Sequence, residues 1–382
     1  MNTFNNPHGE FTLNRYPLQK DDQLRAWDAA DEFLLLHLQD QRIITEESNI
    51  LIINDGFGAL TVSLVSHKPT SINDSYLSQI AIMENAKHNQ FSTDNIILSD
   101  TLQPLSDVYD VVLIKIPKNL AMLEDELFRI RHHCNENTVI VAGAMTKHIH
   151  TSTLKLFERI IGPTRSTLAR KKARLIISQF NPSLKPGSSP YPSEYTLDAN
   201  EDSYFNHANV FSRESLDIGS RFMLQHIPQS PHYKHIVDLA CGNGVLGIAL
   251  ANKNPQAQVT FIDESFMAIA SAKHNVQHLL MNQNKANTNR FTFKVTDCLQ
   301  GIEKKSLDLV LNNPPFHQHH VVGDFIARQM FKESKDKLKS GGELWVVGNR
   351  HLGYHVRLKK LFGNCQSIAS NKKFVILKSV KK

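Results

Sequence analysis

The chain has 382 residues, is 41% hydrophobic and 21% charged, and is longer than one hydrophobic core usually fills, so two globular domains are expected. It has no run of about 18 apolar residues, and its first residues lack the pattern of a signal peptide, so neither a membrane span nor secretion is expected. The four cysteines are scattered without a Cys-x-x-Cys pair, which favours a cytoplasmic protein with neither a disulfide framework nor a metal site.

The net charge is +6, and basic residues gather in the segment ARKKAR, residues 169–174, and near the C-terminal end. Such a surface attracts a polyanion such as RNA, although a solvated basic face has the same composition.

In chain order, the first half alternates apolar β-branched runs with helical patterns. A predicted strand, a glycine-containing turn and a helix begin the series at residues 49–64. Further predicted strands or strand ends follow at residues 70–75, 110–118, 138–145 and 172–178. Alternation of this kind predicts βαβ units and a mostly parallel sheet covered by helices on both faces.

A linker is predicted at residues 181–194, which hold four prolines and several serines. Proline and glycine at this density prevent regular elements from continuing. We therefore expect one domain over residues 1–185 and a second over residues 195–382.

The second half repeats the plan of the first. The corresponding segments are residues 235–250, 260–265, 308–316, 343–350 and 372–378. Because five weak matches occur in one order, we expect a tandem duplication with the α/β fold class, two Rossmann-like domains in one chain.

Candidate ligand residues follow the strands of the second half, where ligands of such sheets bind. Gly242, Gly244 and Gly247 form a G-x-G-x-x-G turn, a pattern shared with dinucleotide sites and with plain strand-to-helix turns. Asp238, just before the turn, would repel a pyrophosphate and attract an ammonium group. A ligand with both an amino group and a carboxylate therefore fits this loop better than a dinucleotide.

Two more carboxylates end predicted strands. Asp263, in VTFIDES, can accept hydrogen bonds from the two hydroxyls of a ribose, or cap the next helix. Asp297, in VTDCL, can accept from an exocyclic amine such as that of adenine, or serve as a turn residue.

The motif NNPPF ends the fourth strand. Asn313 offers a carbonyl acceptor, Pro314 and Pro315 add carbonyls on a stiff loop, and Phe316 offers a face for stacking. Hydrogen-bond acceptors beside an aromatic ring suit a ligand with a planar group that carries –NH2. The alternative interpretation, a proline-rich turn without a ligand role, fits poorly at the end of a buried strand.

The chain resembles class I S-adenosylmethionine-dependent methyltransferases in the order of its motifs, which is D-x-x-C-G-N-G, a second acidic residue, a third Asp and N-P-P-F. The duplicated architecture and the lead-in HANVFSRESLDIGSRFML, residues 207–224, narrow the resemblance to bacterial ribosomal RNA guanine-N2 methyltransferases. The large-subunit type is the more similar, through NNPHGEFTLNRYP near the start and ASNKKFVILK near the end. The resemblance covers essentially the whole chain.

The resemblance implies S-adenosylmethionine as the cofactor and large-subunit ribosomal RNA as the partner. The glycine loop, with Asp238, Gly242, Asn243 and Gly244, would hold the methionine end of the donor, Asp263 the ribose and Asp297 the adenine. Asn313, Pro314, Pro315 and Phe316 would hold the guanine amine for in-line attack on the sulfonium methyl group.

The first half lacks this chemistry at the matching positions. Ile52 stands opposite Asp238, Asn73 opposite Asp263 and Lys115 opposite Asn313. We therefore expect a degenerate copy that binds no donor, whose basic residues Lys115, Lys118 and Lys147, with the segment RKKAR at residues 170–174, grip RNA phosphates. A purely structural partner domain is the alternative.

Other functions stay open at this point. The same motif suits a guanine of the small-subunit RNA, adenine N6 or a protein glutamine amide, and the fold alone suits a non-catalytic RNA-binding assembly factor. A paired target base must be flipped out, so protein-free or partly assembled RNA is the expected substrate, and a monomer is the expected state.

Overall fold

The computed structural model describes residues 2–18, 24–197, 202–281, 288–315 and 322–382. The chain divides into two compact units, Met1–Tyr191 and Pro192–Lys382, and the division falls inside the proline-rich segment 181–194. Within the described ranges, no helix combines the length and the apolar character that crossing a bilayer requires.

The first unit is one seven-stranded mixed sheet with helices and an N-terminal hairpin. The hairpin joins β1 (Thr3–Asn6) to β2 (Gly9–Thr12). The sheet strands are β3 (Ile50–Ile53), β4 (Thr70–Asn73), β5 (Ile97–Asp100), β6 (Val111–Lys115), β7 (Val139–Met145), β8 (Thr164–Ser166) and β9 (Ala173–Gln179). The helices are α1 (Ala29–Asp40), α2 (Ala59–Ser63), α3 (Tyr76–His88), α4 (Leu120–Arg131) and α5 (Thr151–Ile160), with short 3₁₀ turns at Val65–His67, Thr93–Asn95 and Thr146–His148.

The second unit has the same plan. Its hairpin joins β10 (Ser193–Thr196) to β11 (Ser203–Asn206). The sheet strands are β12 (His235–Leu239), β13 (Gln258–Asp263), β14 (Phe291–Val295), β15 (Leu307–Asn312), β16 (Leu338–Asn349), β17 (Gln366–Ser370) and β18 (Phe374–Val380). The helices are α6 (Ile218–Leu224), α7 (Val245–Lys253), α8 (Phe266–Val276), α9 (Val322–Lys337) and α10 (Tyr354–Phe362), with a π turn at Gln277–Met281 and 3₁₀ turns at Thr288–Arg290 and Arg350–Leu352.

The strand orders of the two sheets correspond one to one. They are β5-β4-β3-β6-β7-β9-β8 and β14-β13-β12-β15-β16-β18-β17. Five strands of each sheet are parallel, and the last two run antiparallel to their neighbours. The predicted tandem α/β duplication is confirmed.

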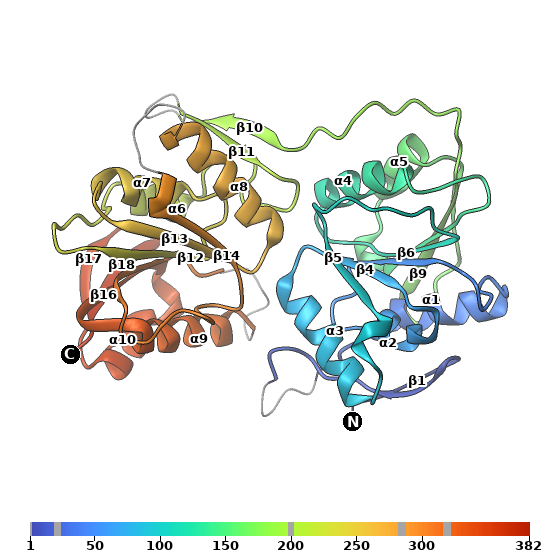
Figure 1. Ribbon diagram of the computed structural model, residues 1–382, viewed down its shortest axis with the longest axis horizontal. Helices are drawn as coiled ribbons and strands as arrows, with labels where there is room; N and C mark the ends of the chain where they lie inside the picture. Colours follow the sequence, from blue (N-terminus) through green and yellow to red (C-terminus); the bar gives the residue numbers. More distant parts are fainter. Residues whose placement is uncertain (1, 19–23, 198–201, 282–287, 316–321) are drawn as a thin grey trace. The chain divides into compact units, whose positions relative to one another are not determined.

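Helices cover both faces of each sheet (Figure 1). In the first unit α1, α2 and α3 pack on one face and α4 and α5 on the other, which gives two separate apolar clusters. In the second unit α6, α7 and α8 pack on one face and α9 and α10 on the other. The central strands β3 and β12 are therefore buried on both sides, which explains their continuous apolar runs.

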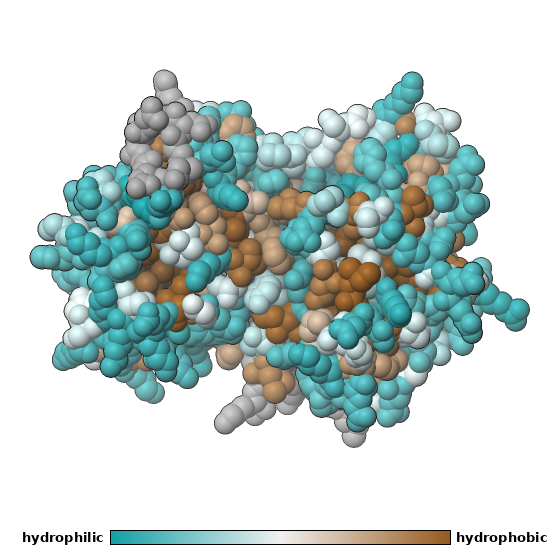
Figure 2. Space-filling model, viewed as in Figure 1, coloured by the Kyte–Doolittle hydropathy of each residue, from teal (hydrophilic) through white to brown (hydrophobic). Residues whose placement is uncertain are grey.

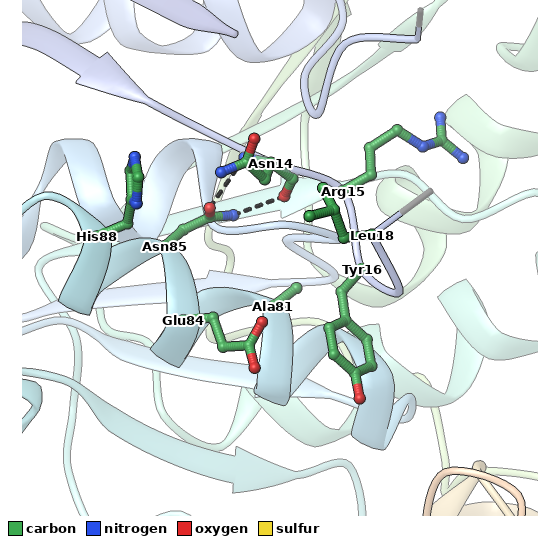
Figure 3. Close-up of a pocket in the computed structure, with 8 residues that line it drawn as sticks. All are labelled: Asn14, Arg15, Tyr16, Leu18, Ala81, Glu84, Asn85 and His88. Carbon is green, nitrogen blue, oxygen red and sulfur yellow. Dashed lines mark hydrogen bonds between the residues drawn. The ribbon is translucent and has the colours of Figure 1, made fainter. Parts of the chain in front are cut away.

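An asparagine clamp ties the start of each unit to its first turn. Asn85 of α3 binds the backbone N–H and carbonyl of Asn14, at 2.9 and 2.8 Å (Figure 3). It also donates to the carbonyl of Phe57 at 2.8 Å. Asn275 of α8 makes the same three contacts, with the N–H and carbonyl of Phe205 and the carbonyl of Asn243. The duplication thus extends to buried polar contacts that the sequence comparison did not find.

Polar side chains cover much of the visible face of each unit (Figure 2). The cavity drawn in Figure 3 has a volume of about 200 Å³ and lies beside the Asn14–Asn85 clamp of the first unit. It is distant in sequence from every candidate ligand residue of the second unit.

Candidate functional site

The candidate site lies at the carboxyl ends of the parallel strands in the second unit. Strand order reverses between β12 and β15, which is where ligands of open α/β sheets bind. After β12 the chain passes through left-handed conformations at Ala240, Gly242 and Gly244 before α7 begins. A Cβ on Gly244 would stand 3.0 Å from Cβ of Ala272, so the glycine lets the loop lie against α8.

Asp238 is fully buried at the end of β12. Its Oδ2 accepts a hydrogen bond from the backbone N–H of Gly247 at 2.7 Å. Burial and, to a smaller extent, the negative charge of Asp263 together raise the pKa of this carboxyl to about 7, against the lowering effect of that hydrogen bond. A positively charged ligand group nearby would favour the ionised form.

Asp263 closes the glycine loop. It ends β13, and its Oδ2 accepts from the N–H of Gly242 at 2.9 Å while its Oδ1 accepts from the N–H of Ser265 at 3.1 Å. Ser265 itself caps α8, through the N–H of Ala268. The structure thus brings the glycine loop and the end of β13 together, as expected for residues that share one ligand.

Asn243 and Asp297 are held by other side chains. Asn243 donates to the hydroxyl of Tyr195 at 3.0 Å. Asp297 is buried two residues beyond β14, where it accepts from Gln329 at 3.0 Å and Gln300 at 3.2 Å. Their proposed ligand roles are therefore combined with structural ones.

The two asparagines at the end of β15, Asn312 within the strand and Asn313 after it, have different surroundings. Asn312 is buried and donates to the carbonyl of Leu239 at 2.9 Å, which ties the ends of β12 and β15 together. Asn313 uses its Nδ2 to donate to Oγ of Ser220 at 2.9 Å and to Oδ2 of Asp217 at 3.2 Å.

Oδ1 of Asn312 and Oδ1 of Asn313 are both buried acceptors without a hydrogen-bond partner among the described residues. Asn312 is fully buried as a residue, whereas Asn313 is partly exposed, so Oδ1 of Asn313 is the acceptor that a ligand can approach. It lies 3.6 Å from the position that a Cβ on Gly219 would take. A buried acceptor without a donor is costly, so this atom is suited to receive a hydrogen bond from a ligand.

Pro314 is buried and Pro315 is half-buried, directly after Asn313. Phe316, the expected stacking ring, lies outside the described residues.

Sequence reasoning missed the residues that hold Asn313. Asp217 is the N-cap of α6 and accepts from the N–H of Ser220 at 2.9 Å. The Asp-x-x-Ser spacing before an apolar run is a recognisable helix start. No sequence signal connects it to an asparagine 96 residues further along.

The first unit also has a contact between the start of a helix and the end of a strand, but there it is an ion pair rather than an amide hydrogen bond. Sheet register matches Asp238–Leu311 with Ile52–Leu113, so Lys115 takes the place of Asn313. Its Nζ lies 2.8 Å from Asp28, the N-cap of α1, and 2.8 Å from Asp31, three residues on. Burial opposes the charge on Lys115, but Asp31 and Asp28 outweigh it and raise the pKa of the ammonium. The expectation that Lys115 grips RNA phosphates is wrong, because the ammonium is committed to this ion pair.

In the first unit, the side chain of Asp55 occupies the inside of the glycine turn to which it belongs. Asp55 is buried and accepts from the N–H groups of Gly58, Ala59, Leu60 and Thr61 at 2.7–3.0 Å. Its Oδ2 also accepts from the hydroxyl of Thr61. This carboxylate lies at the positive end of α2 and uses the backbone N–H groups that a ligand carboxylate would otherwise bind.

Two families match the chain in tandem. Residues 1–182 match the RLMG N-terminal domain, and residues 203–378 match the methyltransferase small domain.

Curated relatives match over the whole length. The chain is 46% identical to the ribosomal RNA large subunit methyltransferase G of Streptomyces coelicolor, covering 98% of this chain and 99% of the relative. It is 47% identical to the protein of the same name from Aeromonas salmonicida, covering 98% of each. Among solved structures, the 16S rRNA N2 methyltransferase (RsmC) of T. thermophilus, in complex with AdoMet and guanosine, aligns with a TM-score of 0.75 at 15% identity and covers 100% of this chain and 97% of that one. This structural likeness confirms the tandem fold.

Proposed function

The chain belongs to the ribosomal RNA large subunit methyltransferase G family, and from this premise we propose that it methylates the exocyclic N2 of a guanine in large-subunit (23S) ribosomal RNA, with S-adenosylmethionine as the donor. The family was predicted from the sequence and is confirmed by relatives of full length. The cytoplasm, where bacterial ribosomal RNA is found, is the proposed location.

The observation that carries the assignment to a planar amine is the state of Asn313. Both hydrogens of its amide are directed at Asp217 and Ser220, and its Oδ1 is a buried acceptor without a donor among the described residues. The –NH2 group of a guanine can supply that donor. The atom stands beside the strand end where the glycine loop begins, so an amine bound there is close to the proposed donor site.

The donor would be held by the loop after β12. Asp238 and Asp263 supply negative charge to a ligand that carries a sulfonium and an ammonium, and Gly242 and Gly244 let the backbone approach it. We propose that Asp263 accepts from the ribose and Asp297 from the adenine. When bound, the donor supplies an electrophilic methyl group on a positively charged sulfur.

The protein residues bind, orient and exclude water. Conjugation to the purine ring makes the N2 lone pair of guanine a poor nucleophile, so orientation must supply much of the rate gain. The acceptors of Asn313 and Pro314 can turn that lone pair toward the methyl carbon. When the methyl group passes to nitrogen, the electron pair of the broken S–C bond would remain on the sulfur, and the extra proton on nitrogen would pass to water.

For the first unit we propose RNA binding without donor binding. Lys118 and Lys147 are exposed near the ends of β6 and β7, and Arg170 and Lys172 are exposed between β8 and β9. Since β9 runs antiparallel to β7, this basic segment lies at the same edge of the sheet as Lys147. The double substitution Lys147→Ala/Arg170→Ala should lower the slope of log affinity against log salt by roughly 1–2. An unchanged slope would leave the unit with a structural role.

The activity is tested by methyl transfer from labelled S-adenosylmethionine to protein-free ribosomal RNAs, followed by digestion to nucleosides. Label in N2-methylguanosine of the large RNA supports the proposal. Label in methyladenosine would mean that the NNPPF motif binds an amine as proposed, but that the base is adenine. Faster transfer to assembled subunits than to protein-free RNA would overturn the expected substrate state.

A further inference from the structure

The first turn of α6 fixes the orientation of the Asn313 amide. Nδ2 donates to both Oγ of Ser220 and Oδ2 of Asp217, so both of its hydrogens are used. A flipped amide would place its oxygen against the carboxylate of Asp217, where two acceptors repel each other. Oδ1 is thereby kept on the side where the described residues supply no donor.

We propose that Asp217 and Ser220 are positioning residues for methyl transfer, which hold the Asn313 amide so that its Oδ1 accepts from the –NH2 group of the substrate base. The proposal rests on the proposed function and adds to it the source of the preference for an amine. A base that presents a carbonyl at this point would face another acceptor, and the amide cannot turn to offer it a donor.

The first unit shows what the arrangement becomes without an acceptor. The N-cap and the residue three positions later contact the strand end in both units, as Asp28 and Asp31 with Lys115, and as Asp217 and Ser220 with Asn313. Lys115 has only donors, and its two carboxylates neutralise it. The contact between helix start and strand end is thus common to both units, whereas an amide with a free acceptor oxygen occurs in the second.

Because the contact is also architectural, a test must separate positioning from folding. Exchange of the two hydrogen-bonding partners does so. Asn313→Asp sets two carboxylates against each other, whereas Asn313→Asp/Asp217→Asn restores a donor on residue 217 and keeps an acceptor oxygen on residue 313. Oδ2 of Asp217 accepts from both Nδ2 of Asn313 and the N–H of Ser220. In the double variant the asparagine side chain must therefore cap α6 with its oxygen while its amide nitrogen faces residue 313, and thermal unfolding checks that this helix start is kept.

The measurements are kcat, KM for RNA, donor affinity by calorimetry, and thermal unfolding of the full chain. We expect kcat of Asn313→Asp to fall about 100-fold, as for loss of one preorganised polar contact in an active site. The exchanged double variant should recover about tenfold or more of that loss. Donor affinity should change less than about threefold throughout. Asp28→Asn, the matched substitution in the first unit, should leave kcat within about twofold of the parent.

Recovery of kcat in the double variant supports the positioning role. A double variant that keeps the parental Tm and donor affinity but is as slow as Asn313→Asp alone overturns that role. Should Asn313→Asp fail to fold, Ser220→Ala replaces it: a loss of one neutral hydrogen bond predicts kcat lowered about fivefold with unchanged donor affinity, and an unchanged kcat overturns the proposal. Failure of the proposed function is seen separately, as a parent protein that forms no N2-methylguanosine.

Discussion

Substituting Gly247 with alanine tests whether the close packing of α7 on β13 maintains the glycine loop. An alanine Cβ would stand 2.2 Å from Cε1 of Phe261 and 2.8 Å from Oδ2 of Asp238. Phe261 is fully buried and its ring stacks on that of Phe293 at 5.1 Å, so it has no open space into which to turn. Either α7 moves away from the sheet or the core is strained.

Three terms set the size of the effect. Overpacking a core costs about 1–3 kcal/mol. Displacing the Gly247 N–H from the Asp238 carboxyl loses about 1.5–3 kcal/mol, whereas the better helix propensity of alanine returns about 1 kcal/mol. The free energy of unfolding of the second unit should therefore fall by about 1.5–5 kcal/mol, a decrease in Tm of roughly 3–20 °C for a domain of this size.

Differential scanning calorimetry of the full chain measures this decrease, and the transition of the first unit serves as an internal reference. The matched control is Gly56→Ala in the glycine turn of the first unit, where a Cβ would meet nothing within 4 Å. Gly56→Ala should shift Tm by less than about 2 °C. A Gly247→Ala protein as stable as the control would refute the packing argument.

Three further predictions concern buried charges. Lys115→Met leaves Asp28 and Asp31 without their cation, so urea titrations should show the first unit destabilised by about 2–4 kcal/mol. The salt dependence of RNA binding should not change, and a reduced salt slope would mean that Lys115 does contact RNA. Asp55→Asn turns an amide N–H group toward backbone donors and should cost the same unit about 2–4 kcal/mol, while a cost below about 1 kcal/mol contradicts the filling role. Because the pKa of Asp238 is raised to about 7 from 3.8, a cationic donor should bind more tightly as the pH rises toward 7, and binding below that pH should release a proton. A donor affinity, measured by calorimetry, that is flat between about pH 5.5 and 8 would contradict a charge contact between Asp238 and the donor.

The sequence located the strand ends well, because apolar runs of strand length followed by Gly, Asp or Asn carry that information locally. Asp238, Asp263 and Asn313 all lie at the sheet edge where they were expected. The duplication was also visible, since corresponding strands keep their order. Phe316, which lies outside the described residues, stays a prediction, and so do the ligand roles.

The partners of the site residues could not be predicted in the same way. The contact of Asp217 with Asn313 depends on how α6 folds back onto the end of β15, and no local pattern reports that. The assignment of Lys115 to RNA failed for the same reason. Nothing in the local sequence marks this lysine as paired, because Asp28 and Asp31 lie more than 80 residues earlier and are brought beside it by α1.

The most direct test of the central claim compares the parent with Asn313→Ala in methyl transfer to protein-free large-subunit RNA, with nucleosides identified after digestion. The account predicts N2-methylguanosine from the parent, a loss of at least about 100-fold in kcat for the variant, and donor affinity within about threefold of the parent. A variant that still forms N2-methylguanosine at the parental rate would contradict the assignment of the acceptor oxygen of Asn313 to the guanine amine.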